Sequence, residues 1–219
     1  MITAAKIKEN PQIRTYVEAA DATLKEMGYT EHSFAHVTRV AHVAEKILAD
    51  LGYPARLCEL AWIAGYMHDI GNVINRIDHA QSGAVMAFRI LDKLGMPADE
   101  IAVICSAIGN HDESTAYPVN EVAAALILAD KTDVRRTRGR TKDRDLFDIH
   151  DRVNYSVEKA STRFLPEQKE ILLELTIDTE ISPVPDYFEI FMDRMLLCRK
   201  AAKRLGLNFR LEINGQKIL

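Results

Sequence analysis

The stretch that decides the fold is ELAWIAGYMHDIGN, residues 59–72. Its residues are apolar almost throughout as far as Met67, and His68 and Asp69 follow directly, shortly before Gly71. An imidazole and a carboxylate at the end of a buried helix are costly unless both have strong partners. A cation is the simplest such partner, and nitrogen and oxygen donors together suit Fe, Mn, Zn, Co or Ni. The stretch therefore predicts a buried helix that ends in two metal ligands.

Further candidate ligands stand at the starts and ends of other apolar segments. His36 opens HVTRVAHVAEKIL, His79 opens HAQSGAVMAFRIL, His111 follows IAVICSAIGN, and Asp130 ends VAAALILAD. A helical bundle can bring such positions to one central pocket, which is a common way of building a dinuclear metal site. A buried hydrogen-bond network is the alternative for His68, Asp69 and Asp130. Helix capping or a polar surface position is the alternative for His36, His79 and His111, each taken alone.

The ordered set of these residues resembles the HD superfamily of metal-dependent phosphohydrolases. That family has His, then His-Asp, then further histidines, then Asp, on a core of helices, and the likeness spans roughly residues 30–135. The resemblance implies two divalent metal ions, with Fe or Mn expected and Zn, Co or Ni as alternatives. It also implies that Asp69 bridges the two ions. The other ligands of the first ion would be His36, His68 and Asp130, and those of the second would be His79 and His111.

Departures from the family pattern reduce the range of expected substrates. The HD domain of ribonuclease Y and the cyclic-di-GMP phosphodiesterases with a Gly-Tyr-Pro motif usually carry a lysine where this chain has Asn72. They also carry a His-His pair where this chain has His111-Asp112. Cyclic-di-GMP is therefore disfavoured, and RNA decay is not implied. The C-terminal part resembles that of uncharacterised predicted HD phosphatases and phosphodiesterases, which brings no substrate with it.

The reaction implied by the resemblance is hydrolysis of a phosphomonoester or phosphodiester, with a nucleotide expected, by metal-activated hydroxide. The expected catalytic residues are His68, Asp69 and Lys131. Phosphate is expected to bind arginines of the basic segment 132–145, at least one of which should face the pocket. The expected substrate contacts are Asn72, Asp112, Arg135 and Arg136.

Several roles and functions stay open. Asp112 can equally be a further ligand, an acceptor behind a ligand or plain surface. His32 and His150 are favoured as surface residues, although either can lie at the site. Two other functions compete with hydrolysis: a di-iron oxygenase that uses the same ligands, and a non-catalytic nucleotide-binding module.

Composition fits an ordinary globular protein, with 219 residues, 47% hydrophobic and 27% charged. A net charge of −4 disfavours a dedicated nucleic-acid binder, although a local patch can still meet a polyanion. The three cysteines lie in apolar runs, and the first ten residues lack the apolar run of a signal peptide. We expect a cytoplasmic protein with no membrane partner and no disulfide. Its oligomeric state stays open, a homodimer included.

Apolar periodicity predicts the organisation of the chain. Helices are expected over 11–27, 33–51, 55–69, 79–95, 98–109 and 119–131, followed by a loop and a short helix over 146–160. Strands are expected at 173–177 and 209–213, separated by a helix over 185–205, and Asn214-Gly215 predicts a hairpin with 216–219 as its return arm. The fold class is therefore mainly α. We expect residues 1–145 to form a helical HD metal-binding domain. We expect residues 146–219 to form a small α+β appendage with antiparallel strands, and this appendage to pack on the helical domain.

Overall fold

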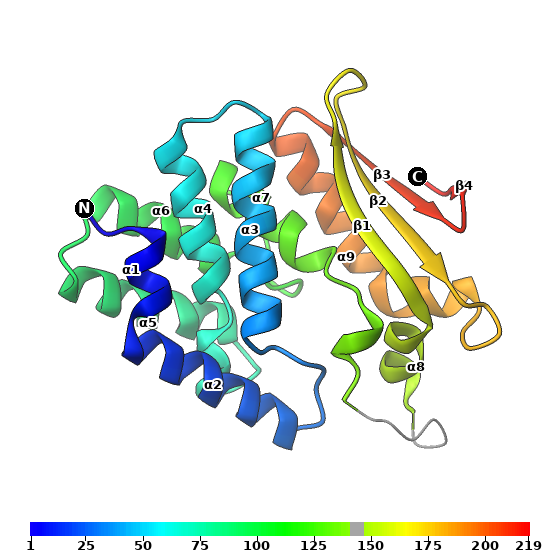
Figure 1. Ribbon diagram of the computed structural model, residues 1–219, viewed down its shortest axis with the longest axis horizontal. Coiled ribbons are helices and arrows are strands. Elements are labelled where there is room, and N and C mark those ends of the chain that lie inside the picture. The colour runs from blue at the N-terminus through cyan, green and yellow to red at the C-terminus, as the bar shows by residue number, and fades with distance from the viewer. Residues whose placement is uncertain (141–146) are drawn as a thin grey trace.

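The computed structural model describes residues 1–140 and 147–219. Helices make up the N-terminal part of the molecule and a sheet lies at its other side (Figure 1). This arrangement confirms the predicted mainly α fold with a small C-terminal α+β part. The N-terminal elements are α1 (Ala4–Glu9), α2 (Pro11–Glu26), α3 (Phe34–Asp50), α4 (Ala55–Met67), the short 3-10 helix η1 (Ile70–Val73), α5 (His79–Lys93), α6 (Ala98–Gly109) and α7 (Glu121–Lys131).

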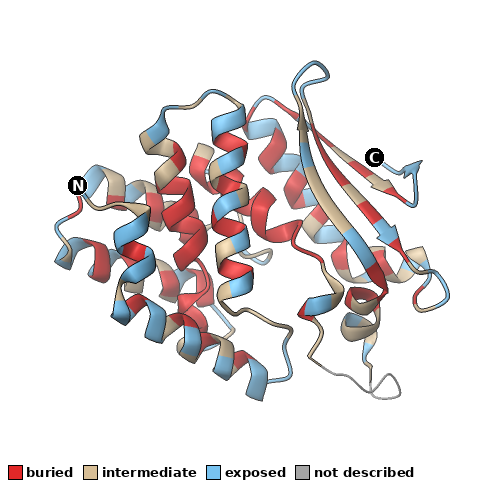
Figure 2. Cartoon of the chain, in the orientation of Figure 1, coloured by how far each residue is buried: buried red, intermediate tan, exposed pale blue. Residues whose placement is uncertain are grey.

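Two helices without a polar face form the centre of this bundle. Every residue of α7 from Val122 to Lys131 is buried, and so is α4 from Leu60 onward (Figure 2). The amphipathic helix α3 packs its apolar side on both of them. Asn120 caps α7 by accepting a hydrogen bond from the backbone N–H of Ala123 at 2.7 Å. Because α4 and α7 are both buried, the polar residues at their C-terminal ends lie in the interior of the bundle.

Two glycines allow the close approaches that position the histidines. A Cβ on Gly65 would lie 2.7 Å from the Cα of Ala41, so α4 touches the backbone of α3 there. A Cβ on Gly71 would lie 2.0 Å from the carbonyl oxygen of His79 and 2.5 Å from the backbone nitrogen of Gly83. Only glycine fits at such distances, and the start of α5 therefore rests directly on η1.

The C-terminal part contains a four-stranded sheet in the order β1-β2-β3-β4. β1 and β2 pair antiparallel, β2 and β3 pair parallel with Leu173 opposite Leu211, and β3 and β4 pair antiparallel. Asn214 and Gly215 form the turn between β3 and β4, as predicted. The elements are η2 (Arg136–Arg138), α8 (Ile149–Ser156), β1 (Val157–Leu165), β2 (Glu170–Ile177), α9 (Val184–Arg204), β3 (Asn208–Ile213) and β4 (Gln216–Lys217).

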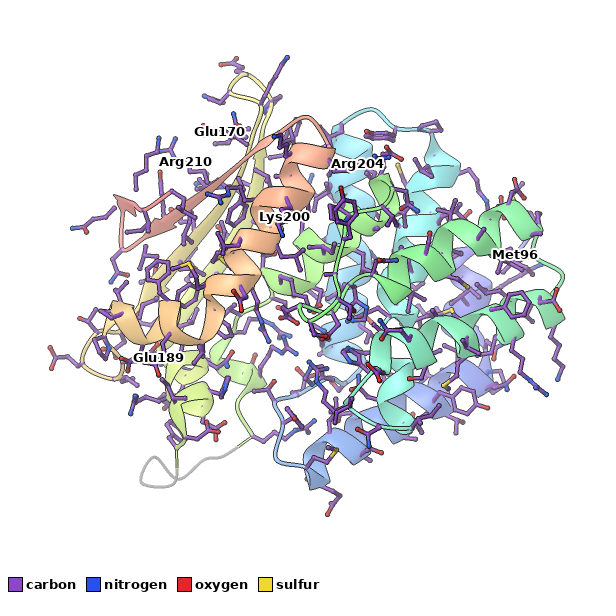
Figure 3. All side chains as sticks on the ribbon, turned by 180° about the vertical axis from the view of Figure 1, so that it is seen from behind. Met96, Glu170, Glu189, Lys200, Arg204 and Arg210 are labelled. Atoms are coloured by element: carbon purple, nitrogen blue, oxygen red, sulfur yellow. The ribbon has the colours of Figure 1, made fainter. Side chains whose placement is uncertain are left out.

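Helix α9 joins the sheet to the helical bundle, because it contacts α7 as well as β2 and β3. Its buried side includes Tyr187, Phe191 and Met195. Arg204 lies at its C-terminal end (Figure 3), where Nη2 is 2.9 Å from Oε1 of Glu121 at the start of α7. The C-terminal part is thus packed against the helices that carry the predicted ligands.

The structure corrects three details of the predicted organisation. Helix α1 and strand β1 were not expected, and the helix predicted over 146–160 ends at Ser156, where β1 begins at Val157. β1 is an edge strand with exposed Glu158 and Lys159, so it lacks a clear apolar alternation. Antiparallel strands were expected throughout the appendage, but β2 and β3 are parallel because α9 crosses between them. The domain boundary predicted at 145/146 lies outside the described residues and stays a prediction.

None of the helices in the described ranges has the length and apolar character needed to cross a membrane. Cys58, Cys105 and Cys198 are free thiols, and two of them, Cys58 and Cys198, are buried.

Candidate metal centre

Three helices bring one group of predicted ligands together. His36 comes from α3, His68 follows α4, and Asp130 comes near the end of α7. Nε2 of His36 lies 3.4 Å from Oδ1 of Asp130, and Nε2 of His68 lies 3.7 Å from the same oxygen. Oδ2 of Asp69 completes this group, 3.6 Å from Nε2 of His36 and 3.2 Å from Nε2 of His68. All four side chains are buried.

A second group of ligands faces the other oxygen of Asp69. Oδ1 of Asp69 lies 3.5 Å from Nε2 of His79, at the start of α5, and 3.9 Å from Nε2 of His111, just after α6. The two Nε2 atoms of these histidines are 3.2 Å apart. The two oxygens of one carboxylate thus point at two separate sets of imidazole nitrogens.

The rings are oriented by acceptors at Nδ1. In each of the four histidines, Nδ1 lies within hydrogen-bond distance of an oxygen, which fixes the proton there and directs the Nε2 lone pair inward. The acceptors are a carboxylate for His36 and backbone carbonyls for the other three: Asp133 Oδ2 at 2.8 Å for His36, Gly65 O at 2.8 Å for His68, Arg76 O at 3.0 Å for His79, and Ile108 O at 2.6 Å for His111.

Buried atoms without a partner mark the place of a cation. Nε2 of His36, Nε2 of His68 and Oδ2 of Asp69 have no hydrogen-bond partner within the described part of the chain. Ligand atoms of His36, His68 and Asp130 lie within 4.8 Å of one another, as do those of His68, Asp69 and His111. Buried polar atoms normally have partners, and a divalent metal would satisfy these three. The residues present therefore fit the metal that the resemblance implies.

Metal binding needs neutral imidazoles and ionised carboxylates, and the pKa shifts of two histidines and both aspartates are in that direction. His68 is the exception, because Asp69 outweighs the effect of burial and raises the pKa of His68 while no metal is bound. Burial lowers the pKa of His79 and holds that of His111 well below its usual value. Burial alone would raise the pKa of Asp69, but the neighbouring His68 outweighs it, and the pKa lies well below its usual value. The pKa of Asp130 is lowered in the same way, with Lys131 as the main opposing charge.

A cavity of about 390 Å³ opens onto the centre. Asp69, His79, His111 and Asp130 lie at its inner end. The C-terminal part forms another wall, with His150 and Asn154 from α8 and Phe191 from α9. Four cationic side chains also line it, and they come from separate parts of the chain: Arg76, Lys131, Arg138 and Arg194.

Lys131 is held by two carboxylates. Its Nζ lies 2.7 Å from Oδ2 of Asp130 and 3.0 Å from Oε2 of Glu113. Burial would lower the pKa of Lys131, but Asp130 and Glu113 outweigh burial and raise it. Arg194 joins the same cluster, because its Nε is 2.6 Å from Oε1 of Glu113. A charged lysine is therefore fixed beside the first ligand group.

None of the four expected substrate contacts, all of which are described residues, lines the cavity. Asn72 donates to Oδ1 of Asp69 at 2.9 Å, so it holds the carboxylate between the ligand groups. Asp112 Oδ1 lies 3.9 Å from Nε2 of His79. Arg135 and Arg136 do not line the cavity. Nε of Arg135 lies 2.6 Å from Oδ1 of Asp133, and the guanidinium of Arg136 lies 4.7 Å from the ring centre of Tyr155.

Several site residues have no clear signal in the sequence. Asp133, Glu113, Arg76 and Arg194 contact the centre or its cavity only because distant segments fold together. His32 does have a signal, since it precedes His36 by four residues, the spacing of one helical turn, although α3 begins only at Phe34. It lines the cavity, its Nε2 lies 4.0 Å from Oδ2 of Asp69, and burial holds its pKa well below the usual value.

Part of the chain matches a known protein family. Residues 33–135 match the HD domain family. No curated protein matches the chain. Among solved structures, a predicted HD superfamily hydrolase from an uncultured Thermotogales bacterium is 24% identical, with a TM-score of 0.45, and the match covers 62% of this chain and 75% of that one. The family match and the buried histidine and aspartate cluster support a metal-dependent hydrolase. Residues 33–135 thus belong to the HD domain family.

Proposed function

We propose that this protein is a phosphohydrolase that uses two divalent metal ions to hydrolyse a phosphomonoester or phosphodiester, with a nucleotide as the expected substrate. One observation carries the proposal: the two oxygens of Asp69, which lines the cavity, face two different sets of imidazole nitrogens. A bridging carboxylate of this kind suits a pair of ions a few ångströms apart.

The ligand sets follow from the contacts. The first ion would be held by His36, His68, Asp69 and Asp130, and the second by Asp69, His79 and His111. Nitrogen and carboxylate donors together suit Fe or Mn, with Zn, Co or Ni as alternatives. When bound, two such ions lower the pKa of a coordinated water and stabilise the charge of a reacting phosphoryl group.

The residues of the chain would orient the ligands and bind the anion. Asn72 and Asp133 hold Asp69 and His36 in place through the contacts given above. Lys131 brings a fixed positive charge to the phosphoryl group beside Asp130. The cavity of about 390 Å³ lies in the range of sites that take small molecules, so a small phosphorylated compound fits this proposal. A cytoplasmic location is part of the proposal as well.

The test is elemental analysis of protein purified without chelator and without nickel affinity, combined with phosphate release from a panel of nucleotides. His36→Ala and Asp69→Ala are the variants, and His42→Ala is the matched control because His42 lies on the same helix but is exposed. We expect about two equivalents of metal in the wild type and in the control. We expect metal and activity to be lost in Asp69→Ala.

Other outcomes would contradict the proposal. One equivalent of metal would remove the second ligand set, and full activity in Asp69→Ala would remove the mechanism. Oxygen consumption with a mixed-valence iron signal and without phosphate release would favour the di-iron oxygenase. A nucleotide that raises the melting temperature without turnover would favour the binding module.

A further inference from the structure

Arg138 is a buried arginine whose hydrogen-bond partners are uncharged. Only 4% of its surface is exposed, and it lines the cavity. Its Nε donates to the carbonyl oxygen of Glu31 at 3.1 Å, and its Nη1 donates to the carbonyl oxygen of Asp133 at 2.9 Å. Neither bond neutralises the charge, and Nη2 has no hydrogen-bond partner within residues 1–140 and 147–219. The geometry leaves this nitrogen available to a ligand in the cavity.

The nearest carboxylate cannot compensate this charge. Oδ2 of Asp133 lies 4.0 Å from Nη1 of Arg138. The same carboxylate is in closer contact with Nε of Arg39 at 3.0 Å, Nε of Arg135 at 2.6 Å and Nδ1 of His36 at 2.8 Å. One negative charge is thus shared by three guanidinium groups and an imidazole. A buried cation without its own counterion is unfavourable, so a bound anion would stabilise it.

Arg194 of α9 presents a second guanidinium to the same cavity. The group lies 4.6 Å from the ring centre of Phe191, and its Nε contacts Glu113, which also pairs with Lys131. Burial lowers the pKa of Arg138. Asp133 and Asp130 oppose this effect without cancelling it, and repulsion from Arg194 adds to it. Two arginines from separate parts of the chain therefore share one cavity beside the metal ligands, although their charges repel.

We propose that Arg138 and Arg194 bind the oxygens of a dianionic phosphate group, which makes a phosphomonoester, rather than a phosphodiester, the substrate class of this cavity. The inference rests on the proposed function. A monoester carries a charge of about −1.5 to −2 at pH 7 and three acceptor oxygens, whereas a diester carries one charge and offers two non-bridging oxygens. Planar guanidinium groups match phosphate oxygens well.

The balanced reaction is simple hydrolysis. The oxygen of water bonds to phosphorus while the P–O bond to the organic group breaks. One proton of the water passes to the departing alkoxide oxygen, and the products are an alcohol and inorganic phosphate. Inorganic phosphate is therefore both the product and a usable probe of the site.

Arg140 provides a matched control. Its Nε donates to the carbonyl oxygen of Tyr29 at 2.8 Å and its Nη2 to that of Thr30 at 3.2 Å, so it holds the same loop as Arg138 does. Arg140 also pairs with Asp21, and it does not line the cavity. Arg140→Gln therefore removes a similar loop contact without changing the charge of the cavity.

The first experiment titrates inorganic phosphate into the metal-loaded protein by calorimetry. Arg138→Gln and Arg194→Gln should each weaken phosphate binding about tenfold or more, since each removes a charged hydrogen bond. Arg140→Gln should bind as the wild type does. Wild-type affinity in Arg138→Gln, or an equal loss in Arg140→Gln, would overturn the assignment. Arg194→Gln leaves the loop untouched, so it carries the same test if Arg138→Gln does not fold.

The second experiment compares 4-nitrophenyl phosphate with its methyl diester, which has the same leaving group. We expect kcat/KM to be at least about tenfold higher for the monoester, and Arg138→Gln to reduce this preference. Faster hydrolysis of the diester would overturn the substrate class. If neither ester and no nucleotide of the panel is hydrolysed, the proposed function fails, while the phosphate titration still decides separately whether Arg138 and Arg194 form an anion site.

Discussion

Buried polar side chains have different partners in the helical region and in the C-terminal region. In the C-terminal region Asn154, Ser156 and Ser182 are buried, and each hydrogen-bonds within a few residues, to His150 O, Val153 O and Asp186 Oδ2. In the helical region the side chains of His36 and Asp69 converge from distant elements and keep buried atoms without a partner. The C-terminal region also has buried nitrogens without a partner, Nε of Arg152 and Nε of Arg210, but both guanidinium groups are ion-paired through another nitrogen. In the helical region the unpartnered atoms of His36, His68 and Asp69 instead face one another, as the ligands of a metal ion would.

This difference has a consequence for stability. A ligand that binds only the folded state raises the free energy of unfolding. Metal should therefore stabilise the protein through the helical region alone. Changes in the C-terminal core should lower stability without changing metal binding, whereas changes around Asp69 should change metal binding and, through it, the stability of the metal-loaded protein. The predictions below test this separation, beginning with the largest effect.

Leu211→Ala should cost the most stability and leave the metal content unchanged. Leu211 is fully buried on β3, opposite Leu173 of β2. Removing a buried leucine side chain lowers the free energy of unfolding by about 2–5 kcal/mol. Urea denaturation of the metal-free protein measures this loss, and elemental analysis of the loaded protein measures the metal. A loss of metal in this variant would show that the regions are not separate.

Gly71→Ala should disturb both stability and one ligand set. The new Cβ would lie 2.0 Å from the carbonyl oxygen of His79, so the start of α5 must move away. Overpacking of this kind costs about 1–3 kcal/mol, and the displacement should weaken the second ion first. Gly109→Ala is the matched control, because its Cβ would meet only Ala84 at an ordinary 3.6 Å. Equal metal content in both variants would contradict the role given to Gly71.

Asp133→Asn should weaken metal binding with a smaller effect on the fold. Asp133 accepts from Nδ1 of His36, and the amide keeps the shape but loses the charge. Loss of such a partner behind a ligand lowers metal affinity about 10- to 100-fold. Competition with a chelator of known affinity measures the change. An unchanged affinity would mean that His36 is held by its packing alone, and would weaken its assignment as a ligand.

The sequence predicts the helices of the helical region because their apolar runs are long, and each predicted metal ligand lies close to the start or the end of one of them. His68 and Asp69 are conspicuous since nothing else in ELAWIAGYMHDIGN beyond Glu59 and Asn72 is strongly polar. Burial of α4 and α7 on all sides follows from the same runs. The periodicity of an apolar face is a local property, so it can be read without knowing the contacts.

The remaining features depend on contacts between distant segments. β1 shows little apolar alternation because it is an edge strand, and only its pairing with β2 makes it a strand. Arg194 lies in an amphipathic helix whose sequence gives no sign of a cavity, and it reaches Glu113 across 81 positions. Arg138 differs from its neighbours Arg135 and Arg136 only in where η2 directs it. Tertiary packing therefore decides which segment becomes a strand and which arginine reaches the cavity.

The smallest predicted effect concerns the ion pair that joins the two regions. Nη2 of Arg204 lies 2.9 Å from Oε1 of Glu121, and the two side chains are 43% and 32% exposed. Exposed pairs contribute only about 0.2–1 kcal/mol, and salt screens them further. A double-mutant cycle with Arg204→Gln and Glu121→Gln, measured by urea denaturation, should give a coupling energy within that range. A much larger coupling energy would mean that this ion pair, rather than the packing of α9 on α7, holds the two regions together. Metal binding would then depend on the Arg204–Glu121 pair.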